Sequence, residues 1–201
     1  MATAAPLSPI SSLGENQASH TGTQFGLASR GMEAWDTLTS RRQVRSYTSD
    51  PIPDEDLDRI LEAGRRAPSA RNAQRWDFVV VSDTAEMERL SQVWQGAVWI
   101  TGAQATIALV MPQADGDQAL VDRFDLGQAA MQMMIAATGQ GIGSGEASCR
   151  DQALAQEILG FPDGHHCALL IALGYPADRP LKPIQKPSRR AFEDVVHFGT
   201  W

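Results

Sequence analysis

Residues 117–145 read DQALVDRFDLGQAAMQMMIAATGQGIGSG, and this stretch decides the fold class. Residues 117–138 are the longest candidate helix, because their apolar side chains recur at a spacing that gives one broad apolar face. A glycine-rich loop, Gly139–Gly145, follows that helix. Dinucleotide-binding fingerprints instead lead from a strand into a helix, and Walker loops end in Gly-Lys-Ser/Thr. Because neither pattern is present here, the stretch argues against a doubly wound nucleotide-binding fold.

The alternating glycines of this loop have two interpretations, and both remain open at this point. They can form the C-terminal cap of the helix, followed by a flexible connection. Alternatively, they mark main chain that must approach a flat ligand closely, which a side chain would prevent.

The elements on either side lack the regular strand–helix–strand rhythm of a parallel sheet. We therefore predict an α+β fold, a three-layer α-β-α sandwich with a mostly antiparallel central sheet. Asp54 is the expected N-cap of a helix, and both Trp76 and the methionines at 131–134 are expected to pack in the core. Helices are expected at 32–40, 54–66, 84–92, 117–138 and 151–159, and strands at 76–81, 105–111, 167–175 and 192–198.

Residues 1–31 are expected to be a flexible N-terminal arm and residues 32–201 a single domain. The formal net charge of -7 disfavours nucleic acids and anionic membranes as partners, since both require a basic face. No apolar run approaches the roughly 20 residues of a membrane-spanning helix, and no secretory signal is visible. These features predict a cytoplasmic protein with two free thiols, Cys149 and Cys167, and no metal site.

Two basic clusters stand out in this acidic chain. Their members are Arg41, Arg42 and Arg45 after the first expected helix, and Lys186, Arg189 and Arg190 near the C-terminus. Three guanidinium groups within five residues repel one another unless an anion lies among them, and each can bind two phosphate oxygens. Together the clusters indicate one shared phosphate, although a solvated basic patch would also explain either cluster alone.

The segment Ser69–Gln74 is a polar loop that carries a hydroxyl and two carboxamides. Such groups offer donors and acceptors, as the pyrimidine edge of a flavin ring also does. Simple solvation of the loop is the competing interpretation.

Several motifs, in this order along residues 32–201, resemble the nitroreductase family of enzymes that use flavin mononucleotide (FMN). The matching segments are RRQVRSY at 41–47, PIP at 51–53 with the helix at 57–66, APSARNAQRW at 67–76, GIGS at 141–144, LGYP at 173–176 and RRAFEDVV at 189–196. No single motif is decisive, whereas the whole series in order is specific.

The resemblance implies a homodimer with two FMN sites at the subunit interface, the long helix in that interface, and C-terminal segments that reach across to the partner. It implies that the FMN phosphate and ribityl chain are held by Arg41, Arg42, Gln43, Arg45, Lys186, Arg189 and Arg190. The loop facing the flavin of the other subunit would supply Pro68, Ser69, Ala70, Asn72 and Gln74. The segment along the flavin ring would be Gly143, Ser144, Gly145, Glu146 and Ala147.

The chain departs from the family pattern in four places. Arg75 stands where a proline usually precedes the tryptophan, and Gln43 replaces a small hydroxyl residue. The stretch Gly145–Cys149 is smaller than the aromatic-containing loop of many relatives, which predicts a wider pocket beside the flavin. Residues 93–120 lack the usual longer insertion, which leaves less of a lid over the substrate.

The activity that the resemblance implies is hydride transfer from NAD(P)H, through FMN, to a small acceptor such as a nitroaromatic, quinone or enone, in a ping-pong cycle. Arg45 is expected at the N1–O2 edge of the flavin, and no side chain is expected to act as an acid, base or nucleophile. Reductive dehalogenation, breakdown of the flavin ring and azoline oxidation remain alternatives, as does a non-catalytic module that binds a flavin or deazaflavin.

Overall fold

The computed structural model describes residues 32–201, so the arm predicted at 1–31 lies outside the described residues. One sheet has the strand order β1-β2-β4-β3, and every neighbouring pair is antiparallel, as predicted. The strands are β1 (Asp77–Val81), β2 (Ala105–Pro112), β3 (Gly143–Ala147) and β4 (His165–Gly174).

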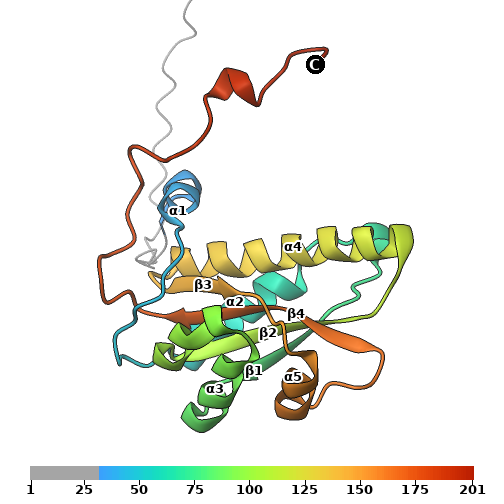
Figure 1. Ribbon diagram of the computed structural model, residues 1–201. Coiled ribbons are helices and arrows are strands. Elements are labelled where there is room, and N and C mark those ends of the chain that lie inside the picture. The colour runs from blue at the N-terminus through green and yellow to red at the C-terminus, as the bar shows by residue number, and fades with distance from the viewer. Residues whose placement is uncertain (1–31) are drawn as a thin grey trace, which may run out of the picture.

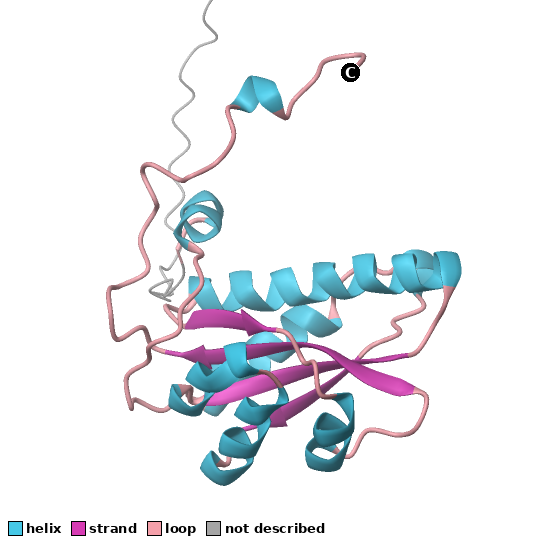
Figure 2. Ribbon diagram, viewed as in Figure 1, coloured by secondary structure: helices cyan, strands magenta, loops and turns pink. Residues whose placement is uncertain are grey.

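Helices cover both faces of this sheet, which confirms the three-layer sandwich (Figures 1 and 2). On one face lie α2 (Asp54–Arg65) and α4 (Gly116–Gly139), with α1 (Ala34–Ser40) against α4. The other face is covered by α3 (Thr84–Leu90), α5 (Gln152–Leu159) and the 3-10 segments Ser91–Val93 and Gln95–Gly102. Among residues 32–201 no helix, α4 included, is long and apolar enough to cross a membrane.

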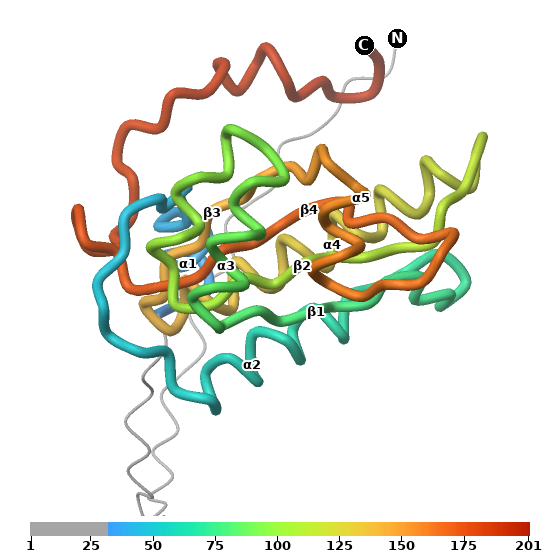
Figure 3. The backbone as a smooth tube through the Cα atoms, turned by 60° about the horizontal axis from the view of Figure 1, so that its bottom comes forward, coloured from blue at the N-terminus to red at the C-terminus, as the bar shows by residue number. Residues whose placement is uncertain are grey.

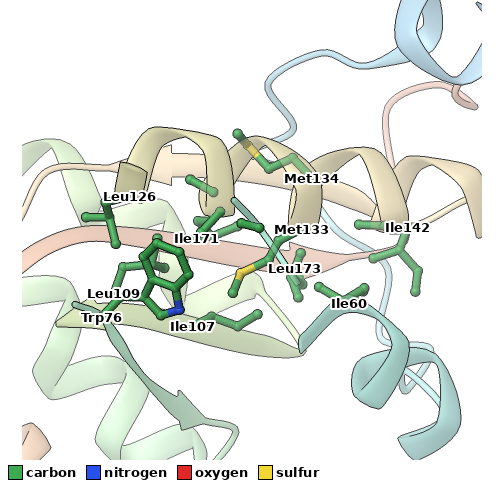
Figure 4. Close-up of a cluster of buried hydrophobic side chains, with 14 of the residues drawn as sticks. Ile60, Trp76, Ile107, Leu109, Leu126, Met133, Met134, Ile142, Ile171 and Leu173 are labelled. Atoms are coloured by element: carbon green, nitrogen blue, oxygen red, sulfur yellow. The ribbon is translucent and has the colours of Figure 1, made fainter. Parts of the chain in front are cut away.

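The two layers of core follow from the alternation of side chains along β2. Ile107 and Leu109 point to the core under α4, whereas Ala108 and Val110 point to the core under α3 and α5. Figure 4 shows the first core, in which Met133 packs over the sheet. The burial of Trp76, Met133 and Met134 confirms their predicted role in packing. For Met131 the prediction is wrong, because this residue lies on the exposed side of α4.

The structure corrects three local predictions. Asp54 is the first helical residue of α2 and caps nothing, because Pro53 holds the N-cap position with an extended ψ of 142°. The second half of the predicted glycine loop is strand β3. The strand predicted at 192–198 is a 3-10 turn, Phe192–Asp194, because no strand among the described residues lies beside it to complete the pairing.

Candidate functional site

The segment Arg41–Tyr47 leaves α1 and runs beside β3. The main-chain N–H of Val44 donates to the carbonyl of Ser144 at 2.9 Å. The hydroxyl of Tyr47 donates to the carbonyl of Val44 at 2.7 Å, which fixes the end of the segment. Burial raises the pKa of Tyr47 well above its ordinary value, against the opposite effect of the Arg45 charge, so the phenol stays protonated. The basic cluster is therefore carried by a fixed extension of the sheet edge.

Gly143 and Gly145 explain how this segment comes so close. A Cβ on Gly143 would lie 2.7 Å from Val44 Cγ2, and one on Gly145 would lie 2.3 Å from the Val44 carbonyl and 2.7 Å from the ring of Trp99. These two glycines do allow a close approach, but the group that they approach is the protein itself, at Val44 and Trp99. Their approach to a flat ligand stays a prediction. The helix-cap interpretation fits the earlier part, where Gly141 takes a φ of 78° just after α4.

Glu146 connects β3 to the basic segment through two side chains. Its carboxylate accepts from Gln43 Nε2 at 2.6 Å, and its main-chain N–H donates to Gln43 Oε1 at 2.8 Å. The same carboxylate lies 3.4 Å from Arg41 Nη2. Gln43, a departure from the family pattern, therefore makes a two-point link that a small hydroxyl residue would not span, and the negative charge of Glu146 is largely compensated.

Arg42 anchors the start of the C-terminal tail. Its Nη2 donates to Asp178 Oδ1 and to the carbonyl of Arg179, both at 2.7 Å. The hydrogen bond from Arg42 lowers the pKa of Asp178, which keeps that carboxyl ionised as a partner.

Three buried polar atoms of this region have no hydrogen-bond partner among the described residues. They are Nε of Arg41, Nε of Arg42 and Oγ of Ser144. Buried donors are normally satisfied, and an unpartnered one requires an explanation. The two guanidinium nitrogens are donors that an anionic ligand would satisfy.

A cavity of about 460 Å³ opens beside the basic segment and the end of β3. It is lined by Arg45, Trp94, Gly96, Trp99, Glu146, Ala147, Ser148 and Leu169. The cavity thus brings together Arg45, Glu146 and Ala147, which were all predicted to lie along the flavin ring. A larger cavity, of about 620 Å³, lies between α2 and β1 and includes, of the predicted residues, Gln74 alone, so we place the site at the smaller one.

Two tryptophans, Trp94 and Trp99, form the walls of the 460 Å³ cavity. From the sequence, each could equally pack in the core or line a pocket, and neither was among the predicted site residues. The guanidinium of Arg45 lies 5.6 Å from the centre of the Trp99 ring, a distance at which cation–π attraction is appreciable. The guanidinium of Arg150 lies at the same distance, 5.6 Å, from the centre of the Trp94 ring. The Trp94 ring also packs on Gly96, where an added Cβ would lie 2.3 Å from it. Each ring is thus packed on a glycine and covered by an arginine. For Trp94 the neighbouring Gly96 is a sequence signal, whereas Gly145 lies too far from Trp99 in the chain to serve as one.

The predicted flavin-facing loop lies elsewhere. Residues 68–74 follow α2, whereas the basic segment precedes it, so the length of α2 separates them (Figure 3). The loop lies against α4 beside an apolar cavity of about 420 Å³. That cavity is lined by Pro68, Ser69, Ala70, Leu120, Val121, Phe124, Asp125 and Gln128. One protomer therefore does not bring the loop to the cavity beside Arg45.

The second basic cluster lies on the exposed tail. The tail passes α1, where the N–H of Ile184 donates to the carbonyl of Thr39 at 3.0 Å, and then leaves the body of the domain (Figure 1). Arg189 and Arg190 bond to carbonyls of the tail itself, and Lys186 is exposed with them. The shared phosphate site of the two clusters is therefore not formed within one protomer and stays a prediction.

Comparison with known proteins gives matches in both sequence and structure. The sequence profile described as the nitroreductase family matches residues 38–115 and 97–175. An NADH dehydrogenase of Thermus thermophilus is 30% identical over 196 residues, covering 79% of this chain and 94% of the relative. An FMN reductase [NAD(P)H] of Bacillus subtilis is 29% identical over 188 residues, covering 82% of this chain and 73% of the relative.

The fold matches solved structures as well. The NADPH:FMN oxidoreductase of Vibrio harveyi, solved in complex with NAD+, superimposes with a TM-score of 0.73 at 25% identity. The match covers 84% of this chain and 77% of that one.

The contact at Gly145 gives a test of the site's packing. Gly145→Ala is expected to lower the free energy of unfolding by about 1–3 kcal/mol, because the new methyl group meets a main-chain oxygen and a buried ring that cannot both withdraw. The control Gly102→Ala adds the same methyl where nothing lies within 4 Å, and should change stability by less than about 0.5 kcal/mol. Urea denaturation of both variants measures the difference; equal midpoints would contradict the packing.

Proposed function

This chain belongs to the nitroreductase family, and on that premise we propose that it is an FMN-dependent oxidoreductase that passes hydride from NAD(P)H to a small acceptor. The observation that carries the proposal is the cavity between Arg45 and the end of β3, with unpartnered guanidinium nitrogens on the same basic segment. The Bacillus subtilis and Vibrio harveyi relatives, an FMN reductase [NAD(P)H] and an NADPH:FMN oxidoreductase, support FMN as the cofactor and NAD(P)H as the reductant.

The residues present suit FMN at both ends of the molecule. Arg41 and Arg42 offer buried, unpartnered nitrogens for a phosphate. Trp99 and the main chain at Glu146–Ser148 offer a flat wall and polar main-chain groups for a ring. When bound, FMN would supply the hydride-transfer chemistry that links NAD(P)H to the acceptor.

The contribution of the chain itself is to bind and to set the local charge. Arg45 would hold positive charge at the ring edge, where it favours the reduced, anionic cofactor. Its stacking on Trp99 restricts its position, so the charge is already in place before a ligand arrives. Glu146 does not cancel this effect, because Gln43 and Arg41 bind its carboxylate.

For the acceptor we propose a small planar molecule, such as a nitroaromatic, a quinone or an enone, used in a ping-pong cycle. The aromatic walls of the cavity suit flat molecules. Steady-state oxidation of NAD(P)H with these acceptors, and with an iodotyrosine as the dehalogenation alternative, would rank the classes.

We also propose that two copies of the chain complete each site. The proposed ligand residues fall on two surfaces of one protomer, separated by α2. The face of α4 beside the 68–74 loop exposes Leu120, Phe124 and Met131, and an apolar face of this kind marks an interaction surface. The tail adds exposed Phe198 and Trp201, and its direction away from the body suits contact with a partner (Figure 1).

The purified protein should be yellow. Its absorption spectrum is expected to show flavin bands, and denaturation should release FMN at about one per chain, identified by mass. A colourless protein that also fails to take up added FMN would remove the proposed function.

Arg45→Ala should raise the dissociation constant of FMN about tenfold or more, since a hydrogen bond to a charged group contributes about 1.5–3 kcal/mol. Arg45→Lys keeps the charge but loses the planar stacking on Trp99, so an intermediate value is expected. Arg59→Ala, on an exposed side chain of α2, is the control and should bind FMN normally. Fluorescence titration of the apoprotein measures all three; an Arg45→Ala protein with wild-type affinity and activity would refute the assignment.

Light scattering should give a mass near twice the 21.8 kDa of one chain. Phe124→Asp puts a charge on the exposed α4 face, so we expect a folded monomer that retains little FMN. Circular dichroism verifies the fold. A monomeric wild-type protein with full FMN content is the result that would rule out the shared site.

A further inference from the structure

We propose that Asp122 and Asp125 of α4 are positioning residues for the flavin site, because they hold the loop Ser69–Arg75 in the conformation that it presents to the cofactor. The inference rests on the proposed function, and it concerns residues that touch neither the cavity beside Arg45 nor the basic segment.

The loop has an unusual main chain. Arg71, Asn72 and Gln74 take left-handed φ values of 55°, 57° and 48°. Residues with a Cβ disfavour this region, and three of them within four positions persist where neighbouring structure imposes the conformation.

The hydrogen bonds inside the loop do not supply that constraint. Gln74 donates from its N–H to Ser69 Oγ at 3.0 Å and from Nε2 to the carbonyl of Asn72 at 3.1 Å. These bonds close the loop on itself, but they do not attach it to the domain.

The attachment comes from α4, at both ends of the loop. At the first end, Asp125 Oδ2 accepts from the N–H of Ala70 at 2.8 Å. At the second end, both carboxylate oxygens of Asp122 lie 3.1 Å from Arg75 Nε. Within the described part of the chain, one further hydrogen bond ties residues 68–75 to the domain, and it also comes from α4. Gln128 Nε2 donates to the carbonyl of Pro68 at the long distance of 3.5 Å.

The burial of the two carboxylates makes this attachment stiff. Asp122 is 4% exposed and Asp125 is 6% exposed, on adjacent turns of the same face of α4. Gln118 donates a second hydrogen bond to Asp122 at 2.6 Å, which fixes its rotamer. Removing the partner of a buried carboxylate leaves an uncompensated buried charge, which is costly in free energy. Movement of the loop away from either carboxylate is therefore strongly opposed.

The loop therefore moves with α4 as one unit. Because α4 also carries the exposed face proposed to meet the second copy, the same helix would set both the dimer contact and the position of the loop. Arg75 is the departure from the family pattern, and in this chain it supplies the charged half of the second attachment.

The test compares Asp125→Ala with Asp125→Asn, which keeps an acceptor for the N–H of Ala70. Asp125→Ala is expected to raise the dissociation constant of FMN at least tenfold and to shift the visible flavin band at saturating FMN, whereas Asp125→Asn should stay within about threefold of wild type. Asp117→Ala, an exposed carboxylate on the first turn of α4, is the matched control and should leave both unchanged.

If Asp125→Ala does not fold, Arg75→Gln decides, because it alters the other attachment through a side chain that is partly exposed. It should raise the dissociation constant several-fold and lower kcat at saturating FMN. Unchanged affinity, flavin spectrum and kcat in the folded variants, with only a lower melting temperature, would show a merely structural role and overturn the inference. A wild-type protein without FMN would instead overturn the proposed function, and this inference with it.

Discussion

The structure depends on one close contact between main chains. The N–H of Val44 donates to the carbonyl of Ser144, and the glycines on either side of Ser144 allow the two segments to lie this close. The contact adds the segment 41–47 to the edge of the sheet and so fixes the direction of its arginines. It also leaves room for Trp99 over Gly145, which gives the cavity one of its walls. Any side chain at position 143 or 145 would push the segment outward, and the cavity, the arginine positions and the anchoring of the tail would change together.

Two of the arginines around this contact form ion pairs with carboxylates, but these pairs leave some guanidinium N–H donors without an acceptor. Arg41 is partly compensated by Glu146 and Arg42 by Asp178, yet the Nε atom of each is buried without a partner. Arg45 forms no ion pair among the described residues and lies on an aromatic ring instead. In a chain with a formal net charge of -7, this local excess of positive donors is the feature that favours an anionic ligand.

Most of the fold could be predicted from the sequence, because hydrophobic periodicity marks the long helices and the apolar strands directly. Strand β3 could not, since Gly143 and Gly145 carry no side chains whose alternation would reveal a strand. The tail was predicted as a strand from its own alternation, but pairing depends on a neighbour that a local pattern does not contain. At the candidate site, motifs predicted Arg45 and the Glu146 stretch, and the structure brings them to one cavity. The sequence could not assign Trp94 and Trp99 to this cavity, because a tryptophan in a cavity wall and one in a core look alike in sequence.

The separation of the two proposed ligand-binding surfaces by α2 has a genetic consequence. The 12 residues of α2 form a rod of about 18 Å between the basic segment and the loop. Under the proposed assembly, each site combines the basic segment of one copy with the loop of the other. A chain defective in its basic segment and a chain defective in its loop would each be inactive alone. Their mixed dimer would contain one site with both defects and one intact site, so two null alleles of this gene would complement each other.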